Sequence, residues 1–473
     1  MDHQPMPVQD NLWLVLDRPE NLLTITAVLW TAEPVDPVCL RALVQERLVD
    51  RFPVFRRRAM TFGRMRRSAV WVDDRCFHLD RHLHVRPMPA PGDQAALQDY
   101  VAALRSEPFD PRHPLWSVHL LQGYGGGSAV VQRYHHAMAD GIRLTQVALG
   151  ILDPVDGADR VPAGTGTARH DGEHLTARAA GLARRLGAGI ALDLAGTATA
   201  LLPEAVRPAH LADVAEDIAT ALVHSAGSVV KILGWSNPET ALSGEPDGAK
   251  AAAWGEPVAL DLLTGIAHAT GTTVNDVCLT LVAGAVARYL VERGQEGPTP
   301  DLAWMVPVNL EPLDRALPPE LGNHFALVLA VLPHGVTDFR ERLAEVHRRM
   351  VLIRDSWEAQ LVWLTQVGIA MSPAPLASAV SDYLAAKAVG VLTNVPGPRG
   401  PMALAGARVE GMVGWAPTSG QQAVTVCIFS YAGRVSVGFG TDRAVVPDPE
   451  RLVAAFDAEV AAATRATLER TPS

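Results

Sequence analysis

The chain has 473 residues, of which 48% are apolar and 19% charged, which is more than one hydrophobic core normally organises, so two globular domains are expected. Its 41 Lys and Arg residues against 51 Asp and Glu residues give a formal net charge of −10, which argues against general nucleic-acid binding. The cysteines form no CxxC pair, and the first residues lack the basic and apolar regions of a signal peptide. We therefore expect a cytoplasmic protein without a zinc site or a disulfide framework.

The first part of the chain predicts alternating strands and helices. Residues 22–30 combine threonine with apolar and β-branched residues, which is typical of a strand, and a helix is expected at 36–51. A second helix is expected at 93–104. Residues 114–123 then predict a strand that pairs with the next strand of the chain.

A pair of histidines ends that next strand. Residues 128–133 form a short, mostly apolar run after a glycine turn, as a buried strand does. Because side chains alternate across a strand, His135 and His136 should point to opposite faces and should not grip one metal or one substrate atom together. Asp140 is placed to cap a helix over 141–152 and to meet the positive end of its dipole.

His136 is the candidate general base, because an imidazole changes its protonation state near neutral pH and this one lies at a corner between two packed layers. The alternative is that both histidines are structural, which is the more common role of histidines near a turn. A metal site is not indicated, since no further His, Cys or Glu follows at a ligand spacing.

The composition changes between the two halves of the chain. Residues 154–166 are rich in Pro, Gly, Asp and Ala, which marks a linker, and an alanine-rich region then continues to about residue 234. We therefore expect an N-terminal domain at 1–165, a helical connector at 166–234 and a C-terminal domain at 235–473.

Three stretches bear on membrane or phosphate contact. Apolar residues recur every four positions from Leu182 to Leu194 beside arginines, a pattern of a helix that either rests on lipid or, more commonly, packs between domains. Residues 359–381 carry no charge but contain glutamines and prolines, which predicts two buried or interfacial helices instead of a membrane span. The arginines of 51–67 form either a patch for the phosphates of coenzyme A or a membrane or, as we favour, a solvated strand face.

The second half predicts another mixture of helices and strands. A long helix is expected at 277–292, capped by a segment that includes Asn275 and Asp276. The other expected elements are helices at 260–270, at 338–352 and from 448, and strands at 302–308, 325–332, 389–398, 422–431 and 434–440, of which the last two form a hairpin.

Six motifs together resemble the bacterial wax ester synthase/acyl-CoA:diacylglycerol acyltransferase (WS/DGAT) family along nearly the whole chain. The histidine corner matches the HHxxxDG signature of acyltransferases that use coenzyme A or carrier thioesters, the superfamily of chloramphenicol acetyltransferase and the peptide-synthetase condensation domains. The matching pieces, in the family's order, are Pro114-Leu115-Trp116, His135-His136-x-x-x-Asp140-Gly141, Asn275-Asp276, Gly322-Asn323, Asn394-Val395-Pro396-Gly397-Pro398 and Ser430-Tyr431-x-Gly433.

This resemblance implies an α/β (α+β) fold of two domains, each like chloramphenicol acetyltransferase, with the active site in a tunnel between them. It implies that His136 takes a proton from a hydroxyl that attacks the thioester of acyl-CoA, so acyl-CoA is a co-substrate and no cofactor is needed. His135 belongs to the same signature, and we expect it to act through packing or positioning. Asp140 would hold the corner by pairing with an arginine, and Gly141 would let the helix approach closely.

The resemblance further implies that Asn275 and Asp276 bring the second domain to the site, and Asn275 is one candidate donor to the oxyanion beside backbone amides. The expected acceptors are diacylglycerol or a long-chain alcohol. Residues that bind these substrates are not predicted from the sequence. Peripheral contact with the inner membrane face or with lipid inclusions is a further interpretation.

Two residues depart from the family's pattern near the expected tunnel. Asn309 stands where a serine is common, and Tyr134 stands where a smaller apolar residue is usual, which puts the choice of acceptor in doubt more than the reaction. Three alternatives stay open: an acyltransferase that esterifies a secondary metabolite, an enzyme that takes its acyl group from a carrier protein, and a non-catalytic lipid-binding protein.

Overall fold

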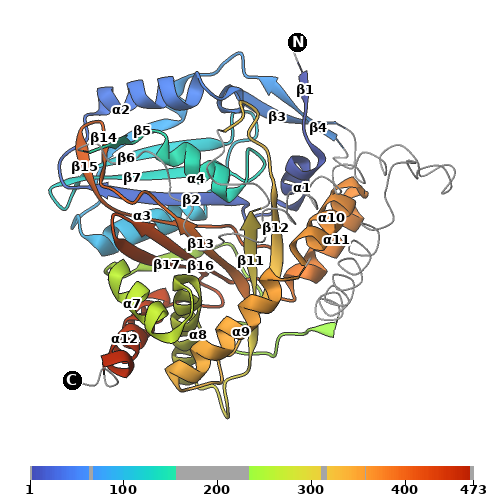
Figure 1. The fold of residues 1–473 in the computed structure, drawn as a ribbon. Helices are drawn as coiled ribbons and strands as arrows, with labels where there is room; N and C mark the ends of the chain where they lie inside the picture. Colours follow the sequence, from blue (N-terminus) through green and yellow to red (C-terminus); the bar gives the residue numbers. More distant parts are fainter. Residues whose placement is uncertain (1–2, 63–67, 156–233, 310–316, 357, 469–473) are drawn as a thin grey trace, which may run out of the picture.

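The computed structural model describes residues 3–62, 68–155, 234–309, 317–356 and 358–468. Within these ranges, two seven-stranded sheets lie next to each other with helices on their outer faces, and a three-stranded sheet lies beside the first (Figure 1). The small sheet consists of β1 (His3–Pro5), β4 (Ser68–Asp73) and β3 (Arg57–Phe62). The expected α/β class is confirmed.

The first sheet is built around β7, the predicted histidine strand. β7 pairs antiparallel with β2 on one side and with β6 on the other, as expected for residues 114–123, and every residue of β7 is buried. The strands follow the order β5 (Leu83–Pro87), β6 (Trp116–Tyr124), β7 (Gly127–His135), β2 (Thr24–Thr31), β15 (Ala407–Trp415), β14 (Met402–Leu404) and β8 (Asp153–Pro154).

The second sheet consists of strands from the second half of the chain. The predicted hairpin is confirmed, because β16 and β17 pair antiparallel along their length. The strands follow the order β10 (Val258–Ala259), β17 (Arg434–Asp442), β16 (Val424–Tyr431), β13 (Gly390–Pro396), β11 (Leu302–Asn309) and β12 (Phe325–Leu332), with β9 (Lys250–Trp254) also paired to β17.

One segment of the second half belongs to the first sheet. β15 pairs antiparallel with β2, and β14 pairs with both β15 and β8. The expected division at residue 235 therefore does not separate the two sheets. The domain bounds 1–165 and 235–473 stay a prediction, and the connector predicted at 166–234 lies almost wholly outside the described residues.

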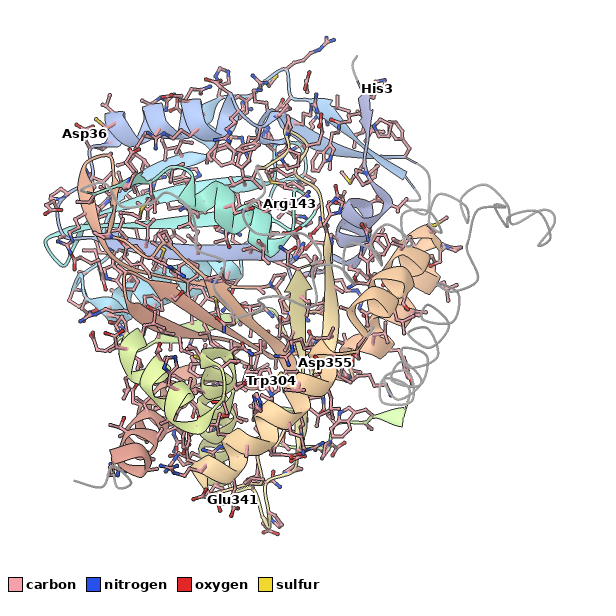
Figure 2. All side chains as sticks on the ribbon, in the orientation of Figure 1. His3, Asp36, Arg143, Trp304, Glu341 and Asp355 are labelled. Carbon is pink, nitrogen blue, oxygen red and sulfur yellow. The ribbon has the colours of Figure 1, made fainter. Side chains whose placement is uncertain are left out.

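Helices cover both sheets (Figure 1). Neighbouring residues of β2 contact different layers, because Leu29 packs in the cluster that contains residues of α2 and α4, and Val28 packs in the cluster that contains residues of α3. Side chains fill the space between the layers, and Trp304, labelled in Figure 2, is completely buried in the core of the second sheet. The helices are α1 (Val8–Leu16), α2 (Pro37–Val44), α3 (Gln94–Arg105), α4 (Gly141–Leu149), α7 (Leu260–Thr270), α8 (Val274–Glu292), α9 (Phe339–Arg354), α10 (Glu358–Met371), α11 (Ala374–Ala385) and α12 (Pro449–Leu468).

The start of α8 differs from the prediction. The helix begins at Val274, because Thr273 is its N-cap and forms a capping box with Asp276. The side chain of Thr273 accepts a hydrogen bond from the backbone N–H of Asp276 at 3.1 Å, and the carboxylate of Asp276 accepts one from the N–H of Thr273 at 3.0 Å. Asn275 and Asp276 are therefore part of the first turn instead of preceding a helix at 277.

Two observations concern apolar helices. The charge-free stretch 359–381 forms α10 and α11, two helices as predicted. Among the residues that the structure describes, α8 alone is long and apolar enough to cross a bilayer, and 72% of its apolar window is buried inside the fold. That burial is what a core helix of a globular protein shows.

Candidate active site

The predicted corner between strand and helix is present. β7 ends at His135, and Asp140 is the N-cap of α4, with its Oδ1 accepting a hydrogen bond from the N–H of Arg143 at 2.9 Å. The backbone N–H of His136 donates to the carbonyl of Leu23 at 2.8 Å, which fixes the corner to the segment that enters β2. Local sequence therefore places both histidines at the end of a buried strand.

The two histidines have different surroundings. Nδ1 of His135 accepts a hydrogen bond from the N–H of Ala137 at 3.0 Å, and its Nε2 lies 3.5 Å from a carboxylate oxygen of Asp17. His136, in contrast, lines a large cavity, whereas His135 does not. The predicted division, in which His135 packs and His136 acts as the base, stays a prediction, but only His136 of the two lines the cavity.

His136 is held in an aromatic setting and is neutral at neutral pH. Its ring stacks on Trp13 with the centroids 4.3 Å apart, and the Phe325 ring lies 5.3 Å away. Burial lowers the pKa of His136 from 6.5 to about 4, since an imidazolium is poorly solvated there. A neutral imidazole at this position is able to accept a proton.

Two residues that the sequence did not identify as site residues lie on the Nδ1 side of His136. Nδ1 of His136 lies 2.9 Å from Oδ1 of Asn323, whose Nδ2 donates to Oδ1 of Asp10 at 2.8 Å. Asp10 and Asn323 are both buried, and burial raises the pKa of Asp10 from 3.8 to about 7. Asn323 was visible only as part of the Gly322-Asn323 motif, and no sequence pattern indicated Asp10.

Asp140 joins this corner to the second half of the chain. Its Oδ2 accepts a hydrogen bond from the N–H of His324 at 2.9 Å, and its own N–H donates to the carbonyl of Gly322 at 3.3 Å. Arg143, labelled in Figure 2, places its Nε 3.9 Å from the Asp140 carboxylate and is the arginine that the resemblance implied. Gly322 has φ +71°, a left-handed conformation that favours glycine.

The expectation for Gly141 is wrong. A Cβ at this position would lie 3.8 Å from Cδ1 of Ile25, which is an ordinary contact, so no close helix approach requires glycine. Gly141 instead lines the cavity.

Neither Asn275 nor Asp276 lines the cavity that His136 lines. Asp276 is buried in the capping box, and its carboxylate also contacts Nδ1 of His347 at 2.7 Å. Asn275 is exposed and accepts a hydrogen bond from Nδ2 of Asn394 at 2.9 Å. Asn394 lines the cavity but Asn275 does not, so Asn275 is linked to the cavity through Asn394, and its role as an oxyanion donor stays a prediction.

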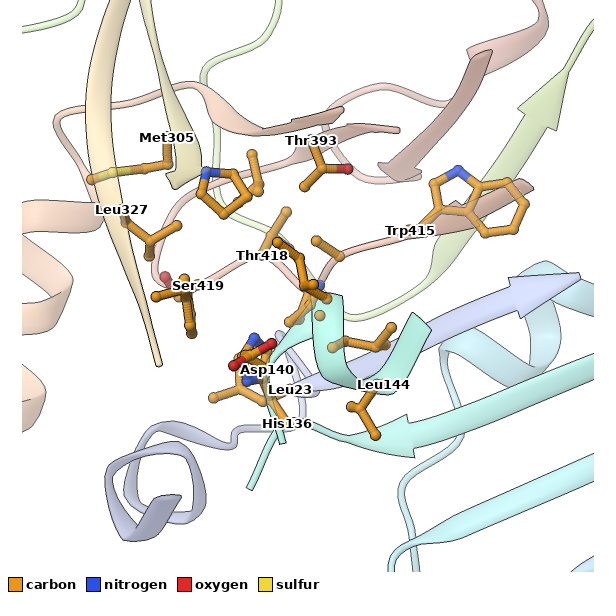
Figure 3. A pocket seen from close by; sticks show the side chains of 18 of the residues that line it. Leu23, His136, Asp140, Leu144, Met305, Leu327, Thr393, Trp415, Thr418 and Ser419 are labelled. Atoms are coloured by element: carbon orange, nitrogen blue, oxygen red, sulfur yellow. The ribbon is translucent and has the colours of Figure 1, made fainter. Parts of the chain in front are cut away.

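A cavity of about 500 Å³ connects the two sheets at His136. Figure 3 shows Leu23, His136, Asp140 and Leu144 on one side of it and Met305, Leu327 and Thr393 on the other. The lining comes from β2, β7, β15, α1 and α4 and from β11, β12, β13, β16, α10 and α11. The lining is mainly apolar, which suits aliphatic chains better than charged ligands. Among its members are Leu12, Leu29, Leu149, Leu361, Val362, Ile369, Leu384 and Met412.

Comparison with protein families shows to which family this chain belongs. Residues 6–278 match the wax ester synthase/diacylglycerol acyltransferase catalytic domain, and residues 321–462 match the WS/DGAT C-terminal domain. The chain belongs to the WS/DGAT family. It is therefore an acyltransferase, and the HHxxxDG corner lies within the matched catalytic domain.

The similarity of this WS/DGAT chain to its relatives covers nearly its whole length. The probable diacylglycerol O-acyltransferase tgs2 of Mycobacterium tuberculosis is 27% identical, with 96% of this chain and 97% of that protein covered. The wax ester synthase/diacylglycerol acyltransferase of Marinobacter aquaeolei shares the fold with a TM-score of 0.67 at 22% identity, covering 98% of this chain and 99% of that one. The first condensation domain of the calcium-dependent antibiotic synthetase has a TM-score of 0.59 at 14% identity, covering 100% and 99%.

Both departures of this WS/DGAT member from the family pattern line the cavity. Asn309 contributes from the end of β11, and Tyr134 contributes from β7, where its hydroxyl donates to Oε1 of the buried Gln132 at 2.5 Å. Tyr134 therefore lines the same cavity as His136, which follows the end of β7. The described residues of this WS/DGAT chain contain no cluster of three or more His, Cys, Asp or Glu that could hold a metal ion.

We expect the stability of this WS/DGAT chain to fall as the pH drops from about 7 to 5. Burial lowers the pKa values of His82, His136 and His334 to about 4 and that of His119 to about 3, so these rings stay neutral when folded but take up protons below 6.5 when unfolded. Asp10 acts in the opposite direction, since its raised pKa lets the folded state keep a proton that the unfolded state loses above 3.8. The unfolded state therefore binds about two to three more protons at pH 5.

The measurement is the free energy of urea unfolding at several pH values from 7.5 to 5. Each net proton corresponds to a slope of about 1.4 kcal/mol per pH unit. Unfolding free energies that are constant over this range would contradict the neutral, buried state of these histidines.

Proposed function

We propose that the protein transfers a long-chain acyl group from acyl-CoA to the hydroxyl of diacylglycerol or of a fatty alcohol, with His136 as the general base. The observation that carries this proposal is a buried, neutral imidazole that opens into an apolar cavity of about 500 Å³. Relatives named diacylglycerol O-acyltransferase support the choice of acceptor.

The reaction needs one proton transfer in each direction. Nε2 of His136 accepts the hydroxyl proton while the hydroxyl oxygen attacks the thioester carbonyl carbon. The carbon–sulfur bond then breaks, and the leaving thiolate takes the proton back from the imidazolium to give free coenzyme A and the ester. Burial around His136 excludes water, which would otherwise hydrolyse the thioester. No covalent enzyme intermediate is required.

We further propose that the protein works on the cytoplasmic side of a lipid surface, since both long-chain acceptors reside in lipid. Met371 at the end of α10 and Leu376 and Tyr383 on α11 are exposed. The same two helices contribute Leu361, Ile369 and Leu384 to the cavity wall. An apolar outer surface on the helices that border the cavity supports transfer of an acceptor directly from lipid. The amphipathic pattern from Leu182 to Leu194 lies outside the described residues.

A second candidate keeps the chemistry and changes the substrates. The likeness of the fold to condensation domains favours an enzyme that takes its acyl group from a carrier protein or esterifies a secondary metabolite. A third candidate, a non-catalytic lipid-binding protein, would bind lipid tightly but release no thiol from acyl-CoA.

The deciding experiment measures free coenzyme A released from palmitoyl-CoA by the purified protein. The reactions contain a long-chain alcohol, diacylglycerol or no acceptor. Release that depends on an acceptor supports the proposal and ranks the acceptors. Release from a carrier-bound donor alone would favour the second candidate, and no release from any donor would favour the lipid-binding protein.

Enlarging the side chain at Ala148 should shift chain-length preference. Ala148 and Leu144 lie one turn apart on the cavity face of α4. In Ala148→Phe the ring would occupy space needed by a long chain, so we expect kcat/KM for palmitoyl-CoA relative to octanoyl-CoA to fall about 10-fold or more, given roughly 0.8 kcal/mol per methylene excluded. The matched control is Ala103→Phe at an exposed position of α3, which should leave the ratio unchanged. An unchanged ratio in Ala148→Phe would place the acyl chain elsewhere.

A further inference from the structure

The groups behind His136 form a chain of hydrogen bonds that no substrate needs to touch. Oδ1 of Asp10 accepts from both the backbone N–H of Asn323 at 3.1 Å and its Nδ2 at 2.8 Å. Nδ2 of Asn323 also donates to the carbonyl of His136 at 3.0 Å. These contacts join α1 and the segment before β12 to the histidine corner.

These hydrogen bonds fix which atom of the Asn323 amide faces the imidazole. The NH2 group of Asn323 lies between two acceptors, Asp10 Oδ1 and the His136 carbonyl, so the amide oxygen must be the atom 2.9 Å from Nδ1 of His136. An amide oxygen only accepts hydrogen bonds, so Nδ1 carries the proton. Nε2 of His136 is therefore the nitrogen with the free lone pair.

We propose that Asn323 and Asp10 are positioning residues that keep the proton of His136 on Nδ1, leave Nε2 free as the base, and stabilise the imidazolium formed during acyl transfer. This inference rests on the proposed function. Neither residue accepts or gives a proton to the substrate. Asn323 acts through a dipole directed at Nδ1, and Asp10 acts by orienting that dipole and adding negative charge behind it.

The charge of Asp10 depends on several neighbouring groups. Burial raises its pKa to about 7, the hydrogen bonds from Asn323 lower it, the nearby Asp140 raises it and Arg143 lowers it. Gly322 lies next to three of the polar side chains, since a Cβ added there would be within 4 Å of Asp10 Oδ2, Arg143 Nη1 and His324 Nε2. Asp10 therefore gains its charge near neutral pH, where it would favour the imidazolium.

Single replacements test the roles of Asn323 and Asp10. Asn323→Leu removes the acceptor from Nδ1, and Asp10→Ala removes the group that orients the amide. We expect kcat for acyl transfer to fall about 10- to 100-fold in each, the worth of a hydrogen bond to a charged group, while KM for acyl-CoA changes little. The exchange variant Asp10→Asn/Asn323→Asp again places an acceptor at Nδ1 and a donor behind it, so its kcat should exceed that of either single replacement.

The pH profile separates this role from simple packing. The wild-type kcat should rise through a step near pH 7 as Asp10 ionises, and Asp10→Asn should lose both the step and about 10-fold in kcat at pH 8. Asp17→Asn is the matched control, because Asp17 follows α1 and lies 3.5 Å from Nε2 of His135. It makes the same chemical change next to the other histidine and should keep the step and the wild-type kcat.

The tautomer provides a readout that does not depend on turnover. In protein labelled with 15N-histidine, the His136 signals are those absent from His136→Ala, and their shifts should show a protonated Nδ1 in the wild type and a change in Asn323→Leu. A protonated Nε2 in the wild type would overturn the proposal. Wild-type kcat and pH profile in Asn323→Leu and Asp10→Asn would also overturn it, whereas absence of acyl transfer in the wild type together with the expected tautomer would reject the proposed function alone.

Discussion

Replacing His136 with alanine will lower kcat for acyl transfer by about 100- to 10,000-fold, the usual contribution of a general base. The hydroxyl of an alcohol is a weak nucleophile, and the described cavity wall offers His136 as a neutral imidazole next to the apolar space where the two substrates would meet. KM for acyl-CoA should change less than kcat, because the acyl chain contacts the cavity wall and not the imidazole alone. Release of coenzyme A under saturating acceptor measures both constants.

His135→Ala is the matched control for this experiment. His135 is buried, and its Nδ1 satisfies the N–H of Ala137, so its loss should cost about 1–3 kcal/mol of stability through an unpaired buried donor. Its effect on kcat should be far smaller than that of His136→Ala in protein that remains folded. Near-normal turnover in His136→Ala, or an equal loss of kcat in a stable His135→Ala protein, would contradict the division of roles.

Replacing Asp140 with alanine will reduce both stability and turnover. Its two carboxylate oxygens accept from the N–H groups of Arg143 and His324, and it is the charged partner of the largely buried Arg143 guanidinium. Removing it takes the carboxylate away from these groups and should lower the free energy of unfolding by roughly 3–5 kcal/mol, as for one partner of a buried pair. The segment that carries Asn323 would shift relative to His136, and a shift of about 1 Å is enough to lower kcat about 100-fold.

The matched control is Asp338→Ala. Asp338 caps α9 in the same way, accepting from the N–H groups of Arg340 and Glu341, but it is exposed and does not line the cavity. This change should cost about 0.5–2 kcal/mol and leave kcat unchanged. Urea unfolding and coenzyme A release measure the two effects, and an Asp140→Ala protein as stable and as active as Asp338→Ala would refute the role assigned to Asp140.

The sequence by itself determined the local elements and singled out His136 as the candidate base. β7 and α4 were predictable because an apolar run, a glycine turn and a capping Asp140 act within a few residues of one another. The two-residue period of a strand predicted opposite directions for His135 and His136; in the structure β7 ends at His135, and of the two only His136 lines the cavity. The start of α8 was missed because its capping box begins at Thr273, whereas the prediction used the later apolar run at 277.

Tertiary structure alone decided what surrounds His136. Asp10 and Asn323 are 313 residues apart in the chain, and their hydrogen bond forms because α1 and the segment before β12 pack against the same corner. β15 pairs with β2 across the predicted domain boundary. This pairing also depends on packing, because the edge of β2 is free to accept a strand from a distant part of the sequence. Sequence periodicity reports which face of an element is buried, but not which distant element covers it. The cavity, the hydrogen bonds behind His136 and the addition of β14 and β15 to the first sheet therefore depend on the assembled sheets.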